Sequence, residues 1–240
     1  MVDISTSLLS VKKEKIIDTV YKLEDANTNY FHIDVMDGEF VENDTHDLML
    51  EYCEYLDNIT KIPLDIHLMV KDVKNFVDSY LIFNPNIITF HYEACKNKEE
   101  VYENIKYIKE CNCKVGLAVK PETKIEEIYE FLPYIHMCLV MTVEPGKGGQ
   151  TLIEETLEKV AKLKELCKNS GIIKVVQKQN NIILYFEPDK FTLDMAELVH
   201  KYNDKIKFST GITPYITYKV QDQKNIIQEI GELLKDANNQ

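Results

Sequence analysis

The feature that most constrains this chain is a regular alternation of short apolar runs with longer amphipathic stretches. The short runs are rich in β-branched residues and predict strands, whereas the longer stretches show helical spacing of apolar residues. Six such strand–helix pairs follow one another: Ile4–Leu9 with Lys12–Leu23, Tyr30–Val35 with Asp47–Leu56, Ile62–Leu68 with Val73–Phe83, Asn86–His91 with Lys98–Lys109, Cys113–Val119 with Lys124–Phe131, and Ile135–Val143 with Leu152–Asn169. This order predicts an α/β fold with a parallel sheet covered by helices.

The last quarter of the chain is less regular. It contains two strand-like runs that resemble a hairpin, then a helix, a strand and a helix: Ile172–Val176, Ile182–Phe186, Leu193–Lys201, Lys205–Thr210 and Asn225–Leu234. If one of the paired runs is an extra strand, the chain holds eight βα units, which close a (β/α)₈ TIM barrel. We therefore expect one barrel domain over residues 1–240, with Ile172–Asn181 as an added strand or hairpin. The competing open doubly wound sheet needs a Gly-x-Gly-x-x-Gly turn after its first strand, and that turn is absent.

Charge and cysteine usage narrow the classes of partner and compartment. The formal net charge of the 240 residues is −12, which repels phosphate backbones, so we expect no nucleic-acid partner. The opening Met1-Val2-Asp3-Ile4 has no basic and apolar leader, and no apolar run is long enough to span a membrane. The six cysteines show no paired C-x-x-C spacing, which favours free thiols. We expect a cytoplasmic protein without membrane contact.

Two neighbouring strands carry polar side chains on a face that should be buried. Residues two apart in a strand share a face, so His32, Asp34 and Met36 point together, as do Asp65, His67 and Met69. One buried His–Asp pair is often only a satisfied core pair. Two such strands side by side instead favour metal or acid–base chemistry. Imidazoles with carboxylates suit Zn²⁺, Fe²⁺, Mn²⁺ or Co²⁺, and the active sites of such barrels lie at this end of the strands.

Two further groups of residues point to the same end of the barrel. The methionines Met36, Met69 and Met141 end inner strands, where they either fill the core or form a soft wall beside a reactive intermediate. The segment Glu144–Gln150 lies between the sixth strand and a helix and contains Gly146, Lys147, Gly148 and Gly149. It is either an ordinary βα turn or a loop whose N–H groups hold an anion such as phosphate.

Five segments together resemble the ribulose-phosphate 3-epimerase family, which includes the allulose-6-phosphate epimerases. They occur in the family's order and spacing: Ile4–Ser10, His32–Val41, Pro63–Met69, His91–Glu93 and Met141–Gln150. The runs His-Ile-Asp-Val-Met-Asp-Gly and Asp-Ile-His-Leu-Met are the most specific. The resemblance covers roughly Ile4 to Asn169 and leaves the rest of the chain unmatched.

The resemblance implies a role for several residues. His32, Asp34 and His67 are implied as metal ligands, Asp34 also as one of two acid–base carboxylates, and Ser7 as a neighbour of the substrate hydroxyls. Gly146, Gly148 and Gly149 are implied near the substrate phosphate. The implied reaction is a metal-dependent isomerisation, the 3-epimerisation of a ketose phosphate of the D-ribulose 5-phosphate type. It proceeds by two-base proton transfer through a metal-stabilised enediolate and needs no organic cofactor. A carbohydrate-metabolism role in the pentose phosphate pathway and a homodimer or larger homo-oligomer are also implied.

The chain departs from the family where the second acid–base group should be. The family's seventh strand ends in Val-Asp-Gly-Gly, whose Asp is also the fourth metal ligand, and no such motif exists here. One alignment places Phe186-Glu187 on Val-Asp, and the other places Val176-Gln177 there. We favour Glu187 as the second catalytic residue because it keeps a carboxylate. The eighth-strand loop is expected at Ser209–Gly211, and Glu42 stands where the family has a proline.

Three functional classes follow from this departure. The chain is an active 3-epimerase, an enzyme of the same chemistry on another sugar phosphate such as allulose 6-phosphate, or a catalytically impaired relative. Asp65 points to the same face as His67, so it either binds the metal or orients a ligand. We expect it to be the fourth ligand, since the family's fourth ligand is in doubt.

Overall fold

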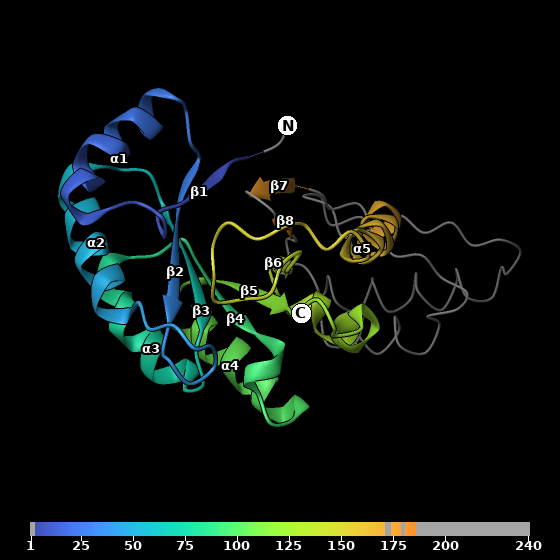
Figure 1. Cartoon of the computed structure of the whole chain (residues 1–240). Helices are drawn as coiled ribbons and strands as arrows, with labels where there is room; N and C mark the ends of the chain where they lie inside the picture. The colour runs from blue at the N-terminus through green and yellow to red at the C-terminus, as the bar shows by residue number, and fades with distance from the viewer. Residues whose placement is uncertain (1–2, 171–173, 179–180, 186–240) are drawn as a thin grey trace, which may run out of the picture.

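The computed structural model describes residues 3–170, 174–178 and 181–185. At its centre six parallel strands curl into half a barrel, with each strand hydrogen-bonded to the next in chain order (Figure 1). They are β1 (Ser5–Ser7), β2 (Tyr30–Met36), β3 (Leu64–Met69), β4 (Ile87–His91), β5 (Lys114–Val119) and β6 (Met137–Val140). The six parallel strands predicted from the apolar runs are therefore present, and the fold is consistent with a (β/α)₈ barrel.

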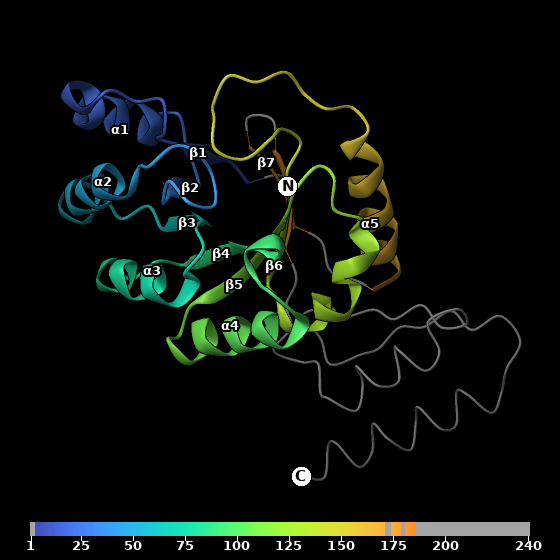
Figure 2. The same ribbon diagram turned by 60° about the horizontal axis from the view of Figure 1, so that its bottom comes forward.

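Helices connect the strands and lie outside the curve of the sheet (Figure 2). They are α1 (Ile16–Asp25), α2 (His46–Ile59), α3 (Val73–Tyr80), α4 (Lys98–Glu110) and α5 (Thr156–Ser170), with short 3₁₀ turns η1 (Lys13–Lys15), η2 (Leu81–Phe83) and η3 (Tyr92–Ala94). The ends are fixed locally: Asp72 and Asn97 accept hydrogen bonds from the first-turn N–H groups of α3 and α4. Such caps satisfy donors that have no partner inside the helix.

One expected helix has a different form. The stretch predicted as a helix over Lys124–Phe131 is a 3₁₀ segment, η4 (Ile125–Tyr134), which contains Pro133. Proline has no N–H to donate, and its ring collides with the carbonyl four residues earlier in an α-helix. A tighter 3₁₀ path avoids this conflict while still burying Ile128 and Phe131.

The two faces of the sheet build different parts of the interior. Residues such as Ile88, Phe90, Val115 and Leu117 belong to the large apolar core that includes the helices. Their neighbours of opposite parity form a second, smaller cluster: Ile87, Ala118, Met137, Leu139 and Met141. Because adjacent strand residues point to opposite faces, this second cluster lies on the concave side. The concave side therefore has its own apolar floor, on the same face as the polar residues of β2 and β3.

The two paired runs after α5 form the expected hairpin. β7 (Lys174–Lys178) pairs antiparallel with β8 (Asn181–Tyr185), and β8 pairs antiparallel with β6. The sheet order is β1-β2-β3-β4-β5-β6-β8-β7, so the strand beside β6 is not the parallel strand that a regular barrel places there. The link between β7 and β8 has only two residues, which is too short for a crossover to a parallel partner. The two strands of the hairpin are therefore antiparallel.

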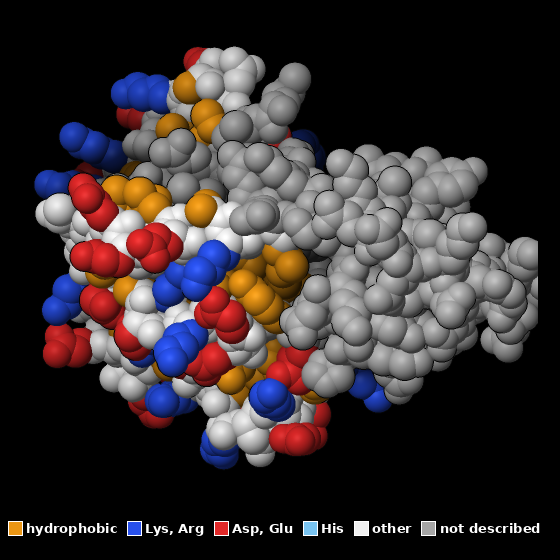
Figure 3. Space-filling model, turned by 90° about the vertical axis from the view of Figure 1, so that its right-hand side faces the viewer, with side chains coloured by type: hydrophobic (Ala, Val, Ile, Leu, Met, Phe, Trp, Pro, Cys, Tyr) orange, Lys and Arg blue, Asp and Glu red, His pale blue; other side chains and the backbone are white. Residues whose placement is uncertain are grey.

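The other expectations for the last quarter lie outside the described residues. These are the elements over Leu193–Lys201, Lys205–Thr210 and Asn225–Leu234, the loop Ser209–Gly211 and the residue Glu187. Within the described residues, no helix combines the length and apolar character needed to cross a bilayer. On the face shown in Figure 3, acidic and basic side chains are interspersed over the described part, with hydrophobic side chains between them.

Candidate active site

The polar residues of β2 and β3 meet in register, as their alternation predicts. His32 is paired with Asp65, Asp34 with His67 and Met36 with Met69 across the two strands. All of these side chains are buried. Their common parity directs them to the concave side of the sheet, and Met36 and Met69 are the last residues of the two strands. This is the end at which parallel barrels build their active sites.

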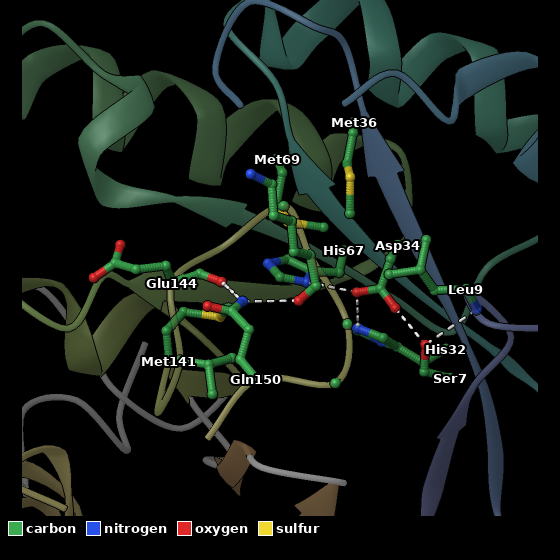
Figure 4. A pocket seen from close by; sticks show the side chains of 15 residues that line it. Ser7, Leu9, His32, Asp34, Met36, His67, Met69, Met141, Glu144 and Gln150 are labelled. Carbon is green, nitrogen blue, oxygen red and sulfur yellow. Dashed lines mark hydrogen bonds and ion pairs between the residues drawn. The ribbon is translucent and has the colours of Figure 1, made fainter. Parts of the chain in front are cut away.

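Asp34 lies at the centre of this group and is contacted from three sides (Figure 4). Its Oδ1 lies 2.8 Å from Nε2 of His32 and 3.2 Å from Nδ1 of His67. Its Oδ2 accepts a hydrogen bond of 2.5 Å from Oγ of Ser7, which in turn accepts one from the backbone N–H of Leu9. The carboxylate is thus fixed in position by groups from β1, β2 and β3.

The surroundings keep Asp34 ionised. Burial alone would raise its pKa, but His32 and His67 outweigh burial and hold that pKa well below its usual range. Burial lowers the pKa of His67 to about 4, so its imidazole is neutral near pH 7. Burial also opposes the charge of His32, but Asp34 and Asp65 on either side outweigh it and raise its pKa. The group therefore presents a negative oxygen beside the neutral imidazole of His67.

His32, Asp34 and His67 fit a divalent cation. One ligand atom from each lies within 4.8 Å of the others. Although Nε2 of His32 is close to Asp34, the pair lacks hydrogen-bond geometry, and this nitrogen has no hydrogen-bond partner among the described residues. A buried nitrogen without a partner is costly, and a cation would satisfy it. Two imidazoles and a carboxylate are a donor set for Zn²⁺, Fe²⁺, Mn²⁺ or Co²⁺.

Asp65 lies on the other side of His32 from this group. Its Oδ2 is 3.0 Å from Nδ1 of His32 and accepts a hydrogen bond of 2.7 Å from Oγ of Ser5. Asp65 is fully buried, and burial raises its pKa. Because it faces the nitrogen of His32 that points away from Asp34, the geometry favours the second expected role. This contact is the one expected of a residue that orients His32, and the role of Asp65 as a fourth ligand stays a prediction.

Two further residues extend the site behind His67. Nε2 of His91 lies 3.0 Å from Nε2 of His67, and Nδ1 of His91 lies 3.2 Å from Oε2 of Glu93. Both belong to a segment that carries the family resemblance, yet sequence reasoning gave neither a role. The alternation that marked β2 and β3 also places His91 on the concave face of β4, at its carboxyl end. Strand alternation could therefore have predicted a role for His91. It could not have done so for Glu93, which lies after the end of β4.

The pocket above Asp34 gathers the residues predicted to bind substrate. It is lined by side chains from the strand ends and by the glycine-rich loop, including Ser7, His32, Asp34, Met36, His67, Met69, Met141, Gly146, Gly148 and Gly149 (Figure 4). The three methionines form an apolar wall and are nearly fully buried. The structure thus brings together the predicted substrate-binding residues, while Glu187 lies outside the described residues.

The glycine-rich loop is held against the loop that follows β2. Asn43 donates a hydrogen bond of 2.7 Å to the carbonyl of Gly146, and Nζ of Lys147 lies 3.1 Å from Oε2 of Glu42. Gly146 has φ +102°, and a Cβ there would lie 2.9 Å from Cβ of Val41. Only glycine meets both conditions without strain. The two loops therefore form one rim of the pocket.

Comparison with known proteins identifies the family of this chain. The Ribulose-phosphate 3 epimerase family model matches residues 3–179. The chain is 30% identical over 234 residues to ribulose-phosphate 3-epimerase of Buchnera aphidicola subsp. Schizaphis graminum, covering 98% of this chain and 95% of that protein. It is 34% identical over 171 residues to that of Methanocaldococcus jannaschii, covering 71% and 70%. For the chloroplastic ribulose-5-phosphate-3-epimerase of Arabidopsis thaliana the values are 31% over 169 residues, covering 70% and 59%. The chain belongs to the ribulose-phosphate 3-epimerase family, a family of isomerases.

Proposed function

We propose that this chain is a metal-dependent 3-epimerase of a ketose phosphate of the D-ribulose 5-phosphate type. The observation that carries the proposal is Asp34, a buried carboxylate held ionised between His32 and His67 at the floor of the pocket. A relative that aligns over nearly the whole chain bears the name ribulose-phosphate 3-epimerase, which supports this substrate class.

The reaction needs a carboxylate on each face of the substrate. Epimerisation at C3 removes the proton from one face, leaves an enediolate, and returns a proton to the other face. Asp34 takes or returns the proton on its side, and Ser7 keeps the second oxygen of this carboxylate in place. A divalent cation held by His32, Asp34 and His67 would supply Lewis-acid stabilisation of the enediolate charge. Glu187 is the proposed second carboxylate.

The rest of the pocket provides binding and shelter. The loop that contains Gly146, Gly148 and Gly149 is the proposed phosphate site, since backbone N–H groups bind anions without adding side-chain charge. Lys147 adds a positive charge that is shared with Glu42. The methionine wall excludes water from the enediolate, which protects the intermediate from unwanted proton exchange. We further propose one domain over the whole chain and a homo-oligomeric assembly.

The test is entry of solvent deuterium at C3 of ribulose 5-phosphate, followed together with the yield of xylulose 5-phosphate. The proposed function predicts both with metal-loaded wild-type protein. Complete absence of deuterium entry would reject it in favour of the impaired relative, a class that the missing Val-Asp-Gly-Gly motif keeps open. Activity on allulose 6-phosphate with none on ribulose 5-phosphate would instead identify the alternative substrate.

A further inference from the structure

His67, His91 and Glu93 form a row of contacts that leads away from Asp34. Nδ1 of His67 faces Asp34, and its Nε2 faces Nε2 of His91 at 3.0 Å. The two ring centroids lie 5.1 Å apart with an interplanar angle of 27°. The two Nε2 atoms are much closer to each other than the two ring centroids are, so the rings meet edge to edge. In that arrangement the two nitrogens lie in line for a hydrogen bond, so one of them carries a proton and the other accepts.

The far end of the row is a carboxylate whose acceptor role is fixed. Oε1 of Glu93 accepts a hydrogen bond of 2.7 Å from the backbone N–H of Lys120 and another from the hydroxyl of Thr123. Oε2 of Glu93 lies 3.2 Å from Nδ1 of His91. These contacts, with those to His91, lower the pKa of Glu93 even though burial opposes them. Glu93 is therefore an acceptor, and Nδ1 of His91 is satisfied when it donates.

The number of protons in the row limits the directions in which its hydrogen bonds can run. Two carboxylates and two imidazoles make three contacts in sequence, yet two neutral imidazoles supply only two N–H groups. If Nδ1 of His91 donates to Glu93, its Nε2 must accept from His67. The proton of His67 is then on Nε2, and Nδ1 presents a lone pair toward Asp34. Asp34 is an acceptor as well, so a cation between Nδ1 of His67 and Asp34 would replace the proton at that contact and leave both N–H groups for the other two.

We propose that His91 and Glu93 are positioning residues, which fix the proton of His67 on Nε2 and so direct its Nδ1 lone pair toward the cation site. The inference rests on the proposed function for the identity of that site and extends it to residues without an assigned role. Carboxylates that orient metal-binding histidines are common, and here the effect reaches His67 through a second imidazole. On the other side of the site, Asp65 contacts His32 directly.

Replacing one carboxylate oxygen of Glu93 by an NH₂ group should reverse the direction of the hydrogen bonds along His91 and His67. In Glu93→Gln the amide oxygen stays on the N–H of Lys120, so the amide NH₂ faces Nδ1 of His91 and donates to it. His91 then carries its proton on Nε2 and donates to His67, whose own proton moves to Nδ1. That proton blocks the lone pair that binds the cation. Glu100→Gln is the matched control, because Glu100 caps α4 through the N–H of Lys96 and contacts neither histidine.

The experiment combines two measurements on metal-free and Zn²⁺-loaded protein. Zn²⁺ affinity is measured by competition with a chromophoric chelator, and ¹⁵N chemical shifts of the imidazoles report which nitrogen carries each proton. We expect wild type and Glu100→Gln to bind Zn²⁺ alike, with the proton of His67 on Nε2. For Glu93→Gln we expect affinity to fall about 10–100-fold and the metal-free protein to carry the His67 proton on Nδ1.

Each outcome supports or rejects the inference. Unchanged Zn²⁺ affinity and unchanged ¹⁵N shifts in Glu93→Gln would reject it while leaving the metal site of the proposed function intact. Failure of wild type to bind Zn²⁺, Fe²⁺, Mn²⁺ or Co²⁺ would reject the metal site itself, and the inference with it. His91→Phe keeps a ring of similar shape but offers no acceptor. It should weaken Zn²⁺ binding without reversing His67, and equal affinity in this variant would also reject the inference.

Discussion

At the residue scale, two buried carboxylates of neighbouring strands differ in what their oxygens face. Asp34 faces two imidazoles and a hydroxyl at the pocket floor, and its pKa is lowered. Asp65 is closed off by His32 and Ser5, and burial raises its pKa. Of the two carboxylates only Asp34 lines the pocket, so we expect Asp34 to be the one that moves a proton. Asp65 contacts His32 and lies away from the pocket floor.

The role of Asp34 is tested by Asp34→Asn. The amide keeps the shape of the side chain but cannot accept the C3 proton. We expect deuterium entry at C3 to fall by at least about 10²–10⁴-fold, the usual contribution of a general acid or base. Asp18→Asn changes an exposed carboxylate on α1 and serves as the control. Retention of more than a tenth of the wild-type exchange rate would argue against Asp34 as the base.

The role of Glu187 is tested by Glu187→Gln. If this residue is the second carboxylate, epimerisation should fall by a similar factor of about 10²–10⁴. Asp34 would still remove and return a proton on its own face. Deuterium would therefore enter C3 without a change of configuration, which NMR of the recovered sugar phosphate can distinguish. Normal epimerisation by this variant would show that the second acid lies elsewhere.

Burial of His67 predicts a pH dependence of stability in the metal-free protein. Its pKa falls from 6.5 in the unfolded chain to about 4 in the fold. Between pH 6.5 and about pH 4, His67 is therefore protonated in the unfolded chain but neutral in the folded protein. The free energy of unfolding should drop by roughly 3 kcal/mol across this window because of His67. The measurement is urea unfolding at several pH values, compared with His67→Gln.

The comparison isolates one residue, because the other titrating groups are present in both proteins. The stability advantage of wild type over His67→Gln should shrink as pH falls from 6.5 to about 4. Below that range it should stay constant. A constant difference across the whole window would mean that His67 is not held neutral by its surroundings.

At the element scale, the rim of the pocket depends on the backbone of the loop after β6. Gly146 has a positive φ and approaches Val41, whereas a Cβ on Gly148 would meet only Oγ of Ser10 at 3.3 Å. Gly146→Ala should therefore cost about 1–2 kcal/mol of unfolding free energy for the left-handed backbone alone, and more from the contact. Gly148→Ala should cost less. Urea denaturation of both variants checks the order, and equal losses would contradict it.

At the scale of the whole molecule, the cation site joins strands that are distant in sequence. His32 and Asp34 come from β2 and His67 from β3, so an ion held by all three would bind the folded chain in preference to the unfolded chain. At a free metal concentration of 100 times Kd, we expect a stabilisation of about 2.7 kcal/mol. Thermal unfolding with Zn²⁺ and with a chelator measures it. His67→Ala should remove the difference, and an equal shift in that variant would contradict the site.

The sequence by itself determined the six strands, the α-helices after all but one of them, and the face on which the site residues lie. The reason is that strand alternation has a fixed period of two, so parity alone put His32, Asp34, Asp65 and His67 together. The paired runs after α5 likewise indicated a hairpin. These inferences need only local spacing, and the register of β2 with β3 confirmed them.

Only the tertiary structure decided which atoms meet. Asp34 lies between the imidazoles of His32 and His67, whereas Asp65 contacts Nδ1 of His32. Strand parity could not predict this difference, because it depends on packing across the strands. Nor could it link Glu93 to His67, since the link passes through the ring of His91. The position of β8 beside β6 could not be predicted for the same reason. Apolar patterning shows that a strand is buried, but its direction is set by the strand with which it pairs.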